Sequence, residues 1–161
     1  MKENYFDKTM RKQYIRPISI CIFRHNEKIL VSETEDDIRD LIFYRPLGGE
    51  IKFGESAEVA LKREILEELN EPIYTIKHLG ILENIFTYRE AKGHEIVFVF
   101  DGKFQNNNIY NQNELIGFEK DDDWGNFKIV WKSISYFLNH PETPLFPTGL
   151  LEILNKNKGK S

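Results

Sequence analysis

Three glutamates that share one helical face are the clearest sign of chemistry in this 161-residue sequence: Glu64, Glu67 and Glu68. A helix turns by about 100° per residue, so Glu67 lies roughly 60° to one side of Glu64 and Glu68 roughly 40° to the other. Like charges at this spacing repel unless a cation offsets them. Because hard ions such as Mg²⁺ and Mn²⁺ take oxygen ligands, the spacing predicts a metal-binding face.

The residues from Ser56 to Asn70 predict the helix that carries these carboxylates. Most of them are strong helix formers, Ser56 is a typical N-cap, and Asn70 followed by Glu71-Pro72 is a typical stop. An apolar stripe on another side of the helix can pack onto a sheet, and it consists of Leu61, Ile65 and Leu69. The alternative interpretation is a solvated acidic face with a purely structural role.

The residues around the acidic face favour the chemical interpretation. Gly48-Gly49 precedes the helix and marks a tight turn or a close approach of the chain. Glu55 lies where the helix starts. Arg63 adjoins the glutamates, where its guanidinium can hold a carboxylate through a charge-assisted hydrogen bond.

The segment 47–70, LGGEIKFGESAEVALKREILEELN, resembles the signature of the Nudix hydrolases, G-x5-E-x7-R-E-U-x-E-E-x-G-U, in which U is a bulky apolar residue. Seven residues occupy the expected places: Gly49, Glu55, Arg63, Glu64, Ile65, Glu67 and Glu68. Asn70 replaces the final glycine, and asparagine is the next-best residue for a left-handed helix end. Glu71 stands where an apolar residue is expected, and Ile73 is a candidate for the missing packing.

The resemblance implies a fold and a reaction. The fold is an α/β/α sandwich with a mixed β-sheet, which is an α/β (α+β) class. The reaction is metal-dependent hydrolysis of a phosphoanhydride (pyrophosphate) bond in a nucleoside diphosphate linked to another moiety, with a metal-activated water as the nucleophile. A catalytically silent sensor that binds a nucleotide on the same fold is the alternative.

The resemblance also implies roles for the residues of the motif. Glu64, Glu67, Glu68 and the carbonyl of Gly48 are the expected ligands of Mg²⁺ or Mn²⁺, and one carboxylate is a candidate base. Arg63 and Glu55 are expected to orient the carboxylate cluster.

Family members often use a further glutamate from outside the motif, and the candidates here are Glu95, Glu114 and Glu119. The sequence does not choose among them, and each is also compatible with a solvated surface position. Arg16 and Arg45, together with Gly48 and Gly49, are candidates for binding substrate phosphate. Surface ion pairing is an equal alternative for both arginines.

Four other side chains are considered for a role in the site or in the core. His94 is a candidate proton carrier, although a lone histidine is more often structural or exposed. Trp124 and Phe86 are candidates for stacking on a nucleobase, whereas Trp131 is expected to pack in the core.

The remaining sequence predicts one domain over residues 1–161, with an ordered core over about 15–155. Strands are predicted at 15–23, 28–33, 41–47, 74–87, 95–104 and 127–131, short helices at 134–138 and 149–155, an Asn-rich loop at 105–113 and a frayed tail at 156–161. The first two strands are expected to form a hairpin through 24–27, and the strands 74–87 and 95–104 a second one through 89–93. This order of elements predicts a mixed sheet with helices on its faces.

Composition bounds the setting and the partners. The net charge of −4 argues against duplex nucleic acid as a partner and leaves a small anionic substrate possible. Cys21 is the only cysteine, which excludes an intrachain disulfide and fits a reducing, cytoplasmic location. The N-terminal residues lack a signal-peptide core and no apolar run is long enough for a membrane helix, so no membrane association is expected. A homodimer is possible on the sequence alone.

Overall fold

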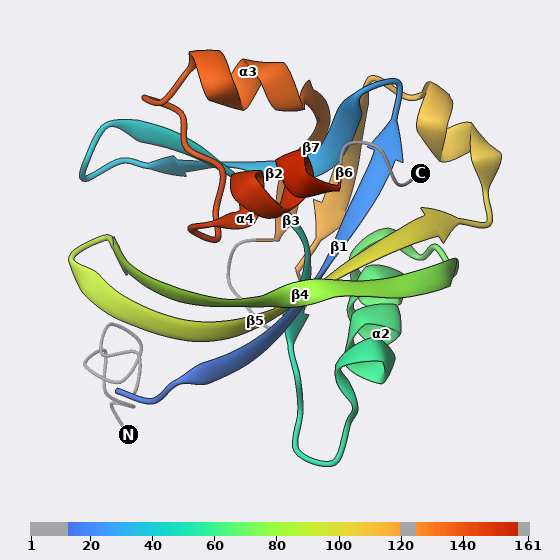
Figure 1. Ribbon diagram of the computed structural model, residues 1–161, viewed down its shortest axis with the longest axis horizontal. Coiled ribbons are helices and arrows are strands. Elements are labelled where there is room, and N and C mark those ends of the chain that lie inside the picture. The colour runs from blue at the N-terminus through green and yellow to red at the C-terminus, as the bar shows by residue number, and fades with distance from the viewer. Residues whose placement is uncertain (1–12, 120–124, 158–161) are drawn as a thin grey trace.

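The computed structural model describes residues 13–119 and 125–157 and contains one seven-stranded sheet in the order β4-β5-β1-β3-β2-β7-β6 (Figure 1). The strands are β1 (Arg16–His25), β2 (Lys28–Asp36), β3 (Leu41–Glu50), β4 (Ile73–Tyr88), β5 (Ala91–Phe104), β6 (Glu114–Phe118) and β7 (Asn126–Ser133). β1 and β5 run parallel, and all other neighbours in the sheet are antiparallel. The prediction of a mixed sheet is confirmed.

Helices cover both faces of the sheet, as the sandwich architecture requires (Figure 1). On one face, α2 (Ala57–Leu69) packs through Leu61 and Ile65, both fully buried. On the other face lie α3 (Ile134–Asn139) and α4 (Leu150–Lys156) with their own cluster of buried apolar side chains. Two cores therefore sandwich the sheet. The short helices α3 and α4 begin and end within one residue of the predicted positions.

Strand β1 is buried on both sides because helices cover both faces. Ile20 and Ile22 belong to the core beneath α3 and α4, whereas Cys21 and Phe23 belong to the core beneath α2. A strand in such a position reads as a continuous apolar run rather than as an alternation. This explains the uninterrupted apolar segment of the sequence around Cys21.

The first hairpin differs from the expectation. β1 and β2 pair only next to the turn, Arg24 with Ile29 and His25 with Lys28. Beyond that point β3 lies between them, pairing with β1 on one side and with β2 on the other. The turn itself is only Asn26-Glu27, with φ of 47° and 62°, which is the two-residue geometry that matches strand twist.

Strand β3 continues through the two glycines instead of ending before them. Gly48 pairs with Ile20 and Gly49 with Ser19. Gly48 has a φ of +146°, and a Cβ atom there would overlap the carbonyl of Ser19. The sequence allowed two roles for this glycine pair, a tight turn or a close approach of the chain. The structure has the close approach, because β3 lies against the backbone of β1 at Gly48.

The segment between β5 and β7 contains two elements that the sequence did not predict. Residues 107–111 form a 3-10 helix, η1 (Asn107–Asn111), and residues 114–118 form β6. β6 alternates buried Leu115 and Gly117 with exposed neighbours, and the ring of Phe127 lies over Gly117. β6 is only five residues long and follows the polar pair Gln112-Asn113. It depends on pairing with β7, which sequence patterns do not reveal.

The turn of the second hairpin and the end of the last helix also differ from their predicted positions. The turn after β4 consists of Arg89-Glu90 alone, and residues 91–93 belong to β5. Lys156 belongs to α4 rather than to a frayed tail, while residues 158–161 lie outside the described part of the chain. No helix in the described residues is long and apolar enough to span a membrane.

We predict that the thiol of Cys21 is unreactive in the folded protein. Burial, reinforced by the nearby charge of Asp101, raises the pKa of this thiol well above its usual value, so the nucleophilic thiolate is scarce. With an aromatic disulfide reagent at about pH 8, native protein should release almost no chromophore, and protein in guanidinium should release one equivalent. Rapid reaction of the native protein would contradict this burial.

Candidate functional site

Helix α2 is held at both ends by the residues that the sequence identified. The Ser56 hydroxyl oxygen accepts a hydrogen bond from the Val59 amide at 3.2 Å. Asn70 adopts a left-handed conformation with φ of 54° and ψ of 35°, and its amide donates to the Leu66 carbonyl. The predicted N-cap and the predicted replacement of the motif glycine are both confirmed. Together they fix the start and the end of the helix that carries the glutamates.

Glu71 and Ile73 account for the other departure from the motif. Ile73 is buried in the core beneath α2, as expected. The carboxylate of Glu71 accepts a hydrogen bond of 2.9 Å from the side chain of Asn106. The polar residue therefore ties the end of α2 to the loop after β5.

The guanidinium of Arg63 is the centre of the acidic cluster. It donates from Nε and Nη2 to the two oxygens of Glu55, at 2.7 and 2.9 Å. Its Nη1 lies 2.7 Å from a carboxylate oxygen of Glu64 and 3.3 Å from one of Glu67. Nη2 also donates to the backbone carbonyl of Glu50, 3.0 Å away. One cation thus joins α2, the loop before it and the end of β3.

Glu55 is strongly biased toward its charged form. The hydrogen bonds from Arg63, and a further one from the Lys52 amide, lower the pKa of the Glu55 carboxyl to about 2. Both of its oxygens are thereby engaged. Glu55 is placed to hold Arg63 in one orientation.

Glu64 and Glu68 have the opposite bias. Burial raises the pKa of Glu64 in spite of the neighbouring Arg63. The pKa of Glu68 is raised well above its usual value, first by burial and then by the charges of Glu119 and Glu64. Glu68 is only 7% exposed, and its Oε2 has no hydrogen-bond partner in the described part of the chain. A buried carboxylate oxygen in this state lacks a countercharge.

Gly49 is the residue that allows Glu64 to approach the sheet. A Cβ atom at Gly49 would overlap the carboxylate of Glu64. The amide of Gly48 is also directed at the carboxylate of Glu68. The glycine pair therefore forms a narrow backbone surface against which the acidic face of α2 rests.

These residues fit a hard divalent cation in their chemistry. All the donors are oxygens, the buried oxygen of Glu68 has no partner, and the charge of Glu119 reaches the same group. Within residues 13–119 and 125–157, however, no three acidic, histidine or cysteine side chains already surround one point where an ion could sit. Arg63 currently holds oxygens of Glu64 and Glu67. The donor set is therefore present, with Glu64 and Glu67 turned toward Arg63.

A cleft of about 480 Å³ extends from the acidic face of α2. Its acidic end is lined by Glu64 and Glu68, together with Gly48, Gly49 and Glu119, whereas Glu67 does not line it. The rest of the lining contains Arg16, Arg39, Arg45, Glu50, Asn84 and Glu95, and an aromatic set of Phe43, Phe86, Tyr88, Phe127 and Phe146. The cleft therefore combines an acidic end, arginines and aromatic rings.

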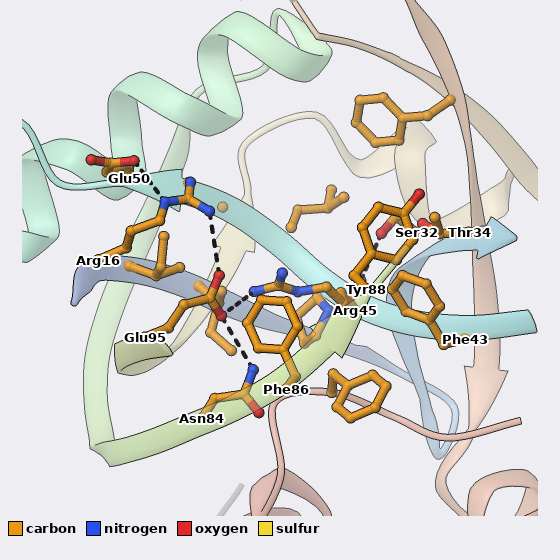
Figure 2. Close-up of a pocket in the computed structure, with 18 of the residues that line it drawn as sticks. Arg16, Ser32, Thr34, Phe43, Arg45, Glu50, Asn84, Phe86, Tyr88 and Glu95 are labelled. Carbon is orange, nitrogen blue, oxygen red and sulfur yellow. Dashed lines mark hydrogen bonds and ion pairs between the residues drawn. The ribbon is translucent and has the colours of Figure 1, made fainter. Parts of the chain in front are cut away.

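Both arginines singled out from the sequence point into this cleft toward one carboxylate, Glu95 (Figure 2). Arg45 Nη2 lies 3.1 Å and Arg16 Nη1 3.6 Å from the oxygens of Glu95, which is fully buried. Arg16 Nε also lies 2.9 Å from Glu50, and Asn84 Nδ2 lies 3.2 Å from Glu95. Glu50 and Asn84 had no local signal in the sequence, since only the pairing of distant strands brings them here.

Two of the aromatic rings are held in place by glycines on the neighbouring strand. The ring of Phe86 lies over Gly93, directly opposite on β5, and the ring of Phe127 lies over Gly117 of β6. A side chain at either glycine would displace the ring. Phe86, one of the two candidates for stacking, therefore reaches the cleft in a defined position.

The remaining aromatic rings form one edge-to-face group. Phe43 contacts Tyr88 and Phe146 with ring centroids 5.7 Å apart in both cases. In Figure 2 the labelled rings of Phe43 and Tyr88 lie to the right of the arginines, and the ring of Phe86 lies below the Arg45 guanidinium. Edge-to-face packing of this kind restricts the rings to few orientations.

The other residues considered from the sequence lie as follows. Glu114 is on β6, away from the cleft lining, with Lys128 at 3.7 Å. His94 lies 3.3 Å from Glu83 and does not line the cleft. Trp131 is partly buried against the core beneath α2, as expected. Trp124 lies outside the described residues.

Comparisons with known proteins agree on the family and the fold. A structure of a NUDIX hydrolase from Nitrosomonas europaea is 21% identical, covers 91% of each chain and has a TM-score of 0.62. A MutT NUDIX hydrolase from Burkholderia pseudomallei is 16% identical over 89% of this chain and 98% of its own, with a TM-score of 0.58. The E. coli ORF135 protein is 20% identical over 90% and 91%, with a TM-score of 0.54.

A comparison with curated proteins found no match. At identities of 15–21%, the likeness to solved structures establishes the fold. The family model for the NUDIX domain matches residues 14–133, which include all strands, α2 and the cleft-lining residues up to β7. On this evidence the chain belongs to the NUDIX family.

Proposed function

We propose that this protein hydrolyses the pyrophosphate bond of a nucleoside diphosphate linked to another moiety. Membership of the Nudix hydrolases supports pyrophosphate-bond hydrolysis in general. The observation that carries the proposal for this chain is the cleft, whose lining combines Glu64 and Glu68 with arginines and aromatic rings. Such a cleft suits a ligand that carries both phosphates and a flat ring.

The proposed cation site consists of Glu64, Glu67 and Glu68, with the carbonyl of Gly48. Among the three glutamates considered outside the motif, Glu119 is the one we assign to this set, because it lines the cleft and its charge acts on Glu68. Mg²⁺ or Mn²⁺ held there would neutralise charge on phosphoryl oxygens and lower the pKa of water. Glu64 and Glu67 would have to turn away from Arg63 to join it.

The protein residues then have distinct tasks. Arg16 and Arg45 bind phosphate oxygens, and Phe86 packs against the flat group of the substrate. A water attacks phosphorus, the bond from phosphorus to the bridging oxygen breaks, and a carboxylate of the cluster accepts the proton of the water. Glu55 and Arg63 keep α2 and its glutamates in place, and they act only through the orientation of those groups.

A panel of dinucleotides, nucleotide sugars and nucleoside triphosphates, incubated with Mg²⁺ or Mn²⁺, tests the reaction. Glu64→Gln and Glu68→Gln should retain the fold and lose activity by more than the 10–100-fold typical of groups that orient a ligand, a range that Glu55→Gln should match. Glu58→Gln is the control, because Glu58 is exposed on the same helix. Full activity in both cluster variants would exclude the proposed site. Tight nucleotide binding without any product would instead identify a sensor.

Glu68 yields a second test through pH and metal. Since its folded-state pKa is raised, its protonated form stabilises the fold below about pH 4.5, and this contribution is lost as the pH rises through the folded pKa. In EDTA, Glu68→Gln should therefore melt a few degrees above the wild type at about pH 8 and show a smaller difference at about pH 4. Thermal melts at both pH values measure this.

The same melts test cation binding. Mn²⁺ should raise the melting temperature of the wild type by mass action and should raise that of Glu68→Gln much less. An equal shift in both proteins would show that Glu68 holds no cation. Glu58→Gln again serves as the control and should behave as the wild type does.

Phe86 tests the assignment of the ring-binding end. Phe86→Ala should raise KM about ten-fold for substrates that carry a base, because stacking is worth about 1–3 kcal/mol. It should leave KM for inorganic tripolyphosphate unchanged. The control is Tyr74→Ala, an exposed aromatic residue on the same strand. Equal effects on both substrates would reject the stacking role.

A further inference from the structure

Glu95 is a buried carboxylate placed between two guanidinium groups. It lies on β5 and is fully inaccessible, yet Arg45 from β3 approaches to 3.1 Å and Arg16 from β1 to 3.6 Å. Asn84, from β4, donates to the same oxygen as Arg45, at 3.2 Å. Four strands therefore meet at one acidic side chain (Figure 2).

A carboxylate buried to this extent needs compensation. Desolvation disfavours its charge unless opposite charges and hydrogen bonds offset the loss of water. Here Oε2 of Glu95 accepts hydrogen bonds from Arg45 and Asn84, whereas Oε1 has no hydrogen-bond partner among the described residues and faces the charge of Arg16 at 3.6 Å. Conversely, the guanidinium groups of Arg16 and Arg45 both face Glu95 and would repel each other without it. The position of each arginine therefore depends on the same carboxylate.

The arrangement leaves donors of both arginines at the cleft. A guanidinium has five N–H donors. Glu95 engages one nitrogen of each, and Glu50 engages a second nitrogen of Arg16. Both arginine side chains are 27% exposed and line the cleft. The cluster of two arginines and Glu95 carries a net positive charge, which Glu50 offsets only on the side of Arg16.

The orientation of Glu95 is fixed through Asn84 by a residue of the C-terminal segment. Asn84 is 1% exposed, and while its Nδ2 donates to Glu95, its Oδ1 accepts a hydrogen bond of 3.2 Å from the Thr148 amide. Thr148 directly precedes Gly149, the N-cap residue of α4. Both ends of the Asn84 amide are used, so Glu95 has one preferred orientation.

We infer that Glu95 is a positioning residue that holds Arg16 and Arg45 as a pair of forks for substrate phosphate, and that it is not a ligand of the cation. The inference rests on the proposed function, since it concerns phosphate groups in the same cleft. Bidentate guanidinium forks bind phosphate oxygens well when their orientation is fixed in advance. Glu95 provides that fixed orientation without touching the substrate.

The test compares Glu95→Gln with the wild type in two binding measurements that need no turnover. Calorimetry with methylenediphosphonate, which cannot be hydrolysed, should show roughly ten-fold weaker binding in the variant. Titration with Mn²⁺ alone, followed by electron paramagnetic resonance, should give the same affinity in both proteins. If a substrate is turned over, KM should rise while kcat changes little.

The matched control is Asp101→Asn. Asp101 lies on the same strand as Glu95 and pairs with Arg24 of β1 at 3.6 Å, but outside the cleft. Its loss should leave both affinities unchanged. Circular dichroism checks that each variant is folded, and if Glu95→Gln does not fold, Arg45→Lys and Arg16→Lys replace it, since they keep the charge toward Glu95 and lose the fork.

A double-mutant cycle shows whether Glu95 acts through the arginines. The loss of diphosphonate affinity caused by Glu95→Gln should become much smaller in an Arg45→Ala background, because the anchored group is already gone. Independent, additive losses would overturn the inference. A ten-fold loss of Mn²⁺ affinity in Glu95→Gln would also overturn it and would make Glu95 a cation ligand. Because neither binding measurement needs hydrolysis, an inactive wild type would reject the proposed reaction without affecting this result.

Discussion

The contacts of one guanidinium, that of Arg63, decide the arrangement of the acidic cluster. This group faces two oxygens of Glu55, one each of Glu64 and Glu67, and the backbone at the end of β3. Negative side chains crowded on one helical face repel, and without Arg63 that repulsion would act on the helix and the loop before it. With Arg63, the glutamates are close together and still compatible with a stable fold.

Arg63 does not compensate every carboxylate of the cluster, and Glu68 is the exception. Glu68 is the most buried member, and the raised pKa of its carboxyl reflects burial and neighbouring negative charge. A residue chosen for stability alone would be apolar or neutral at this position. The proposed function accounts for this destabilised charge beside Gly48, because a bound cation would supply the countercharge. In that proposal Glu68 binds the cation, whereas Glu55 and Arg63 position the cluster.

Local sequence patterns predicted the fold and the motif well, but they did not predict contacts between residues far apart in the chain. The limits of α2 followed from Ser56 and Asn70, since caps act within a few residues. β6 was missed because its stability comes from pairing with β7. Likewise, the sequence offered Glu95 and Arg45 as separate candidates, but they lie 50 positions apart and meet only because β1 lies between β3 and β5.

The glycines beneath the aromatic rings have a consequence for how this cleft could diversify. Gly93 and Gly117 lie behind Phe86 and Phe127, so a single methyl group added at either position would push a ring toward the ligand space. Relatives could then acquire new preferences through changes on the far side of a ring, with every ligand-facing residue conserved. Comparing only the residues that face the cleft would overlook this route, and a survey of substrate range should include the strand positions opposite each ring.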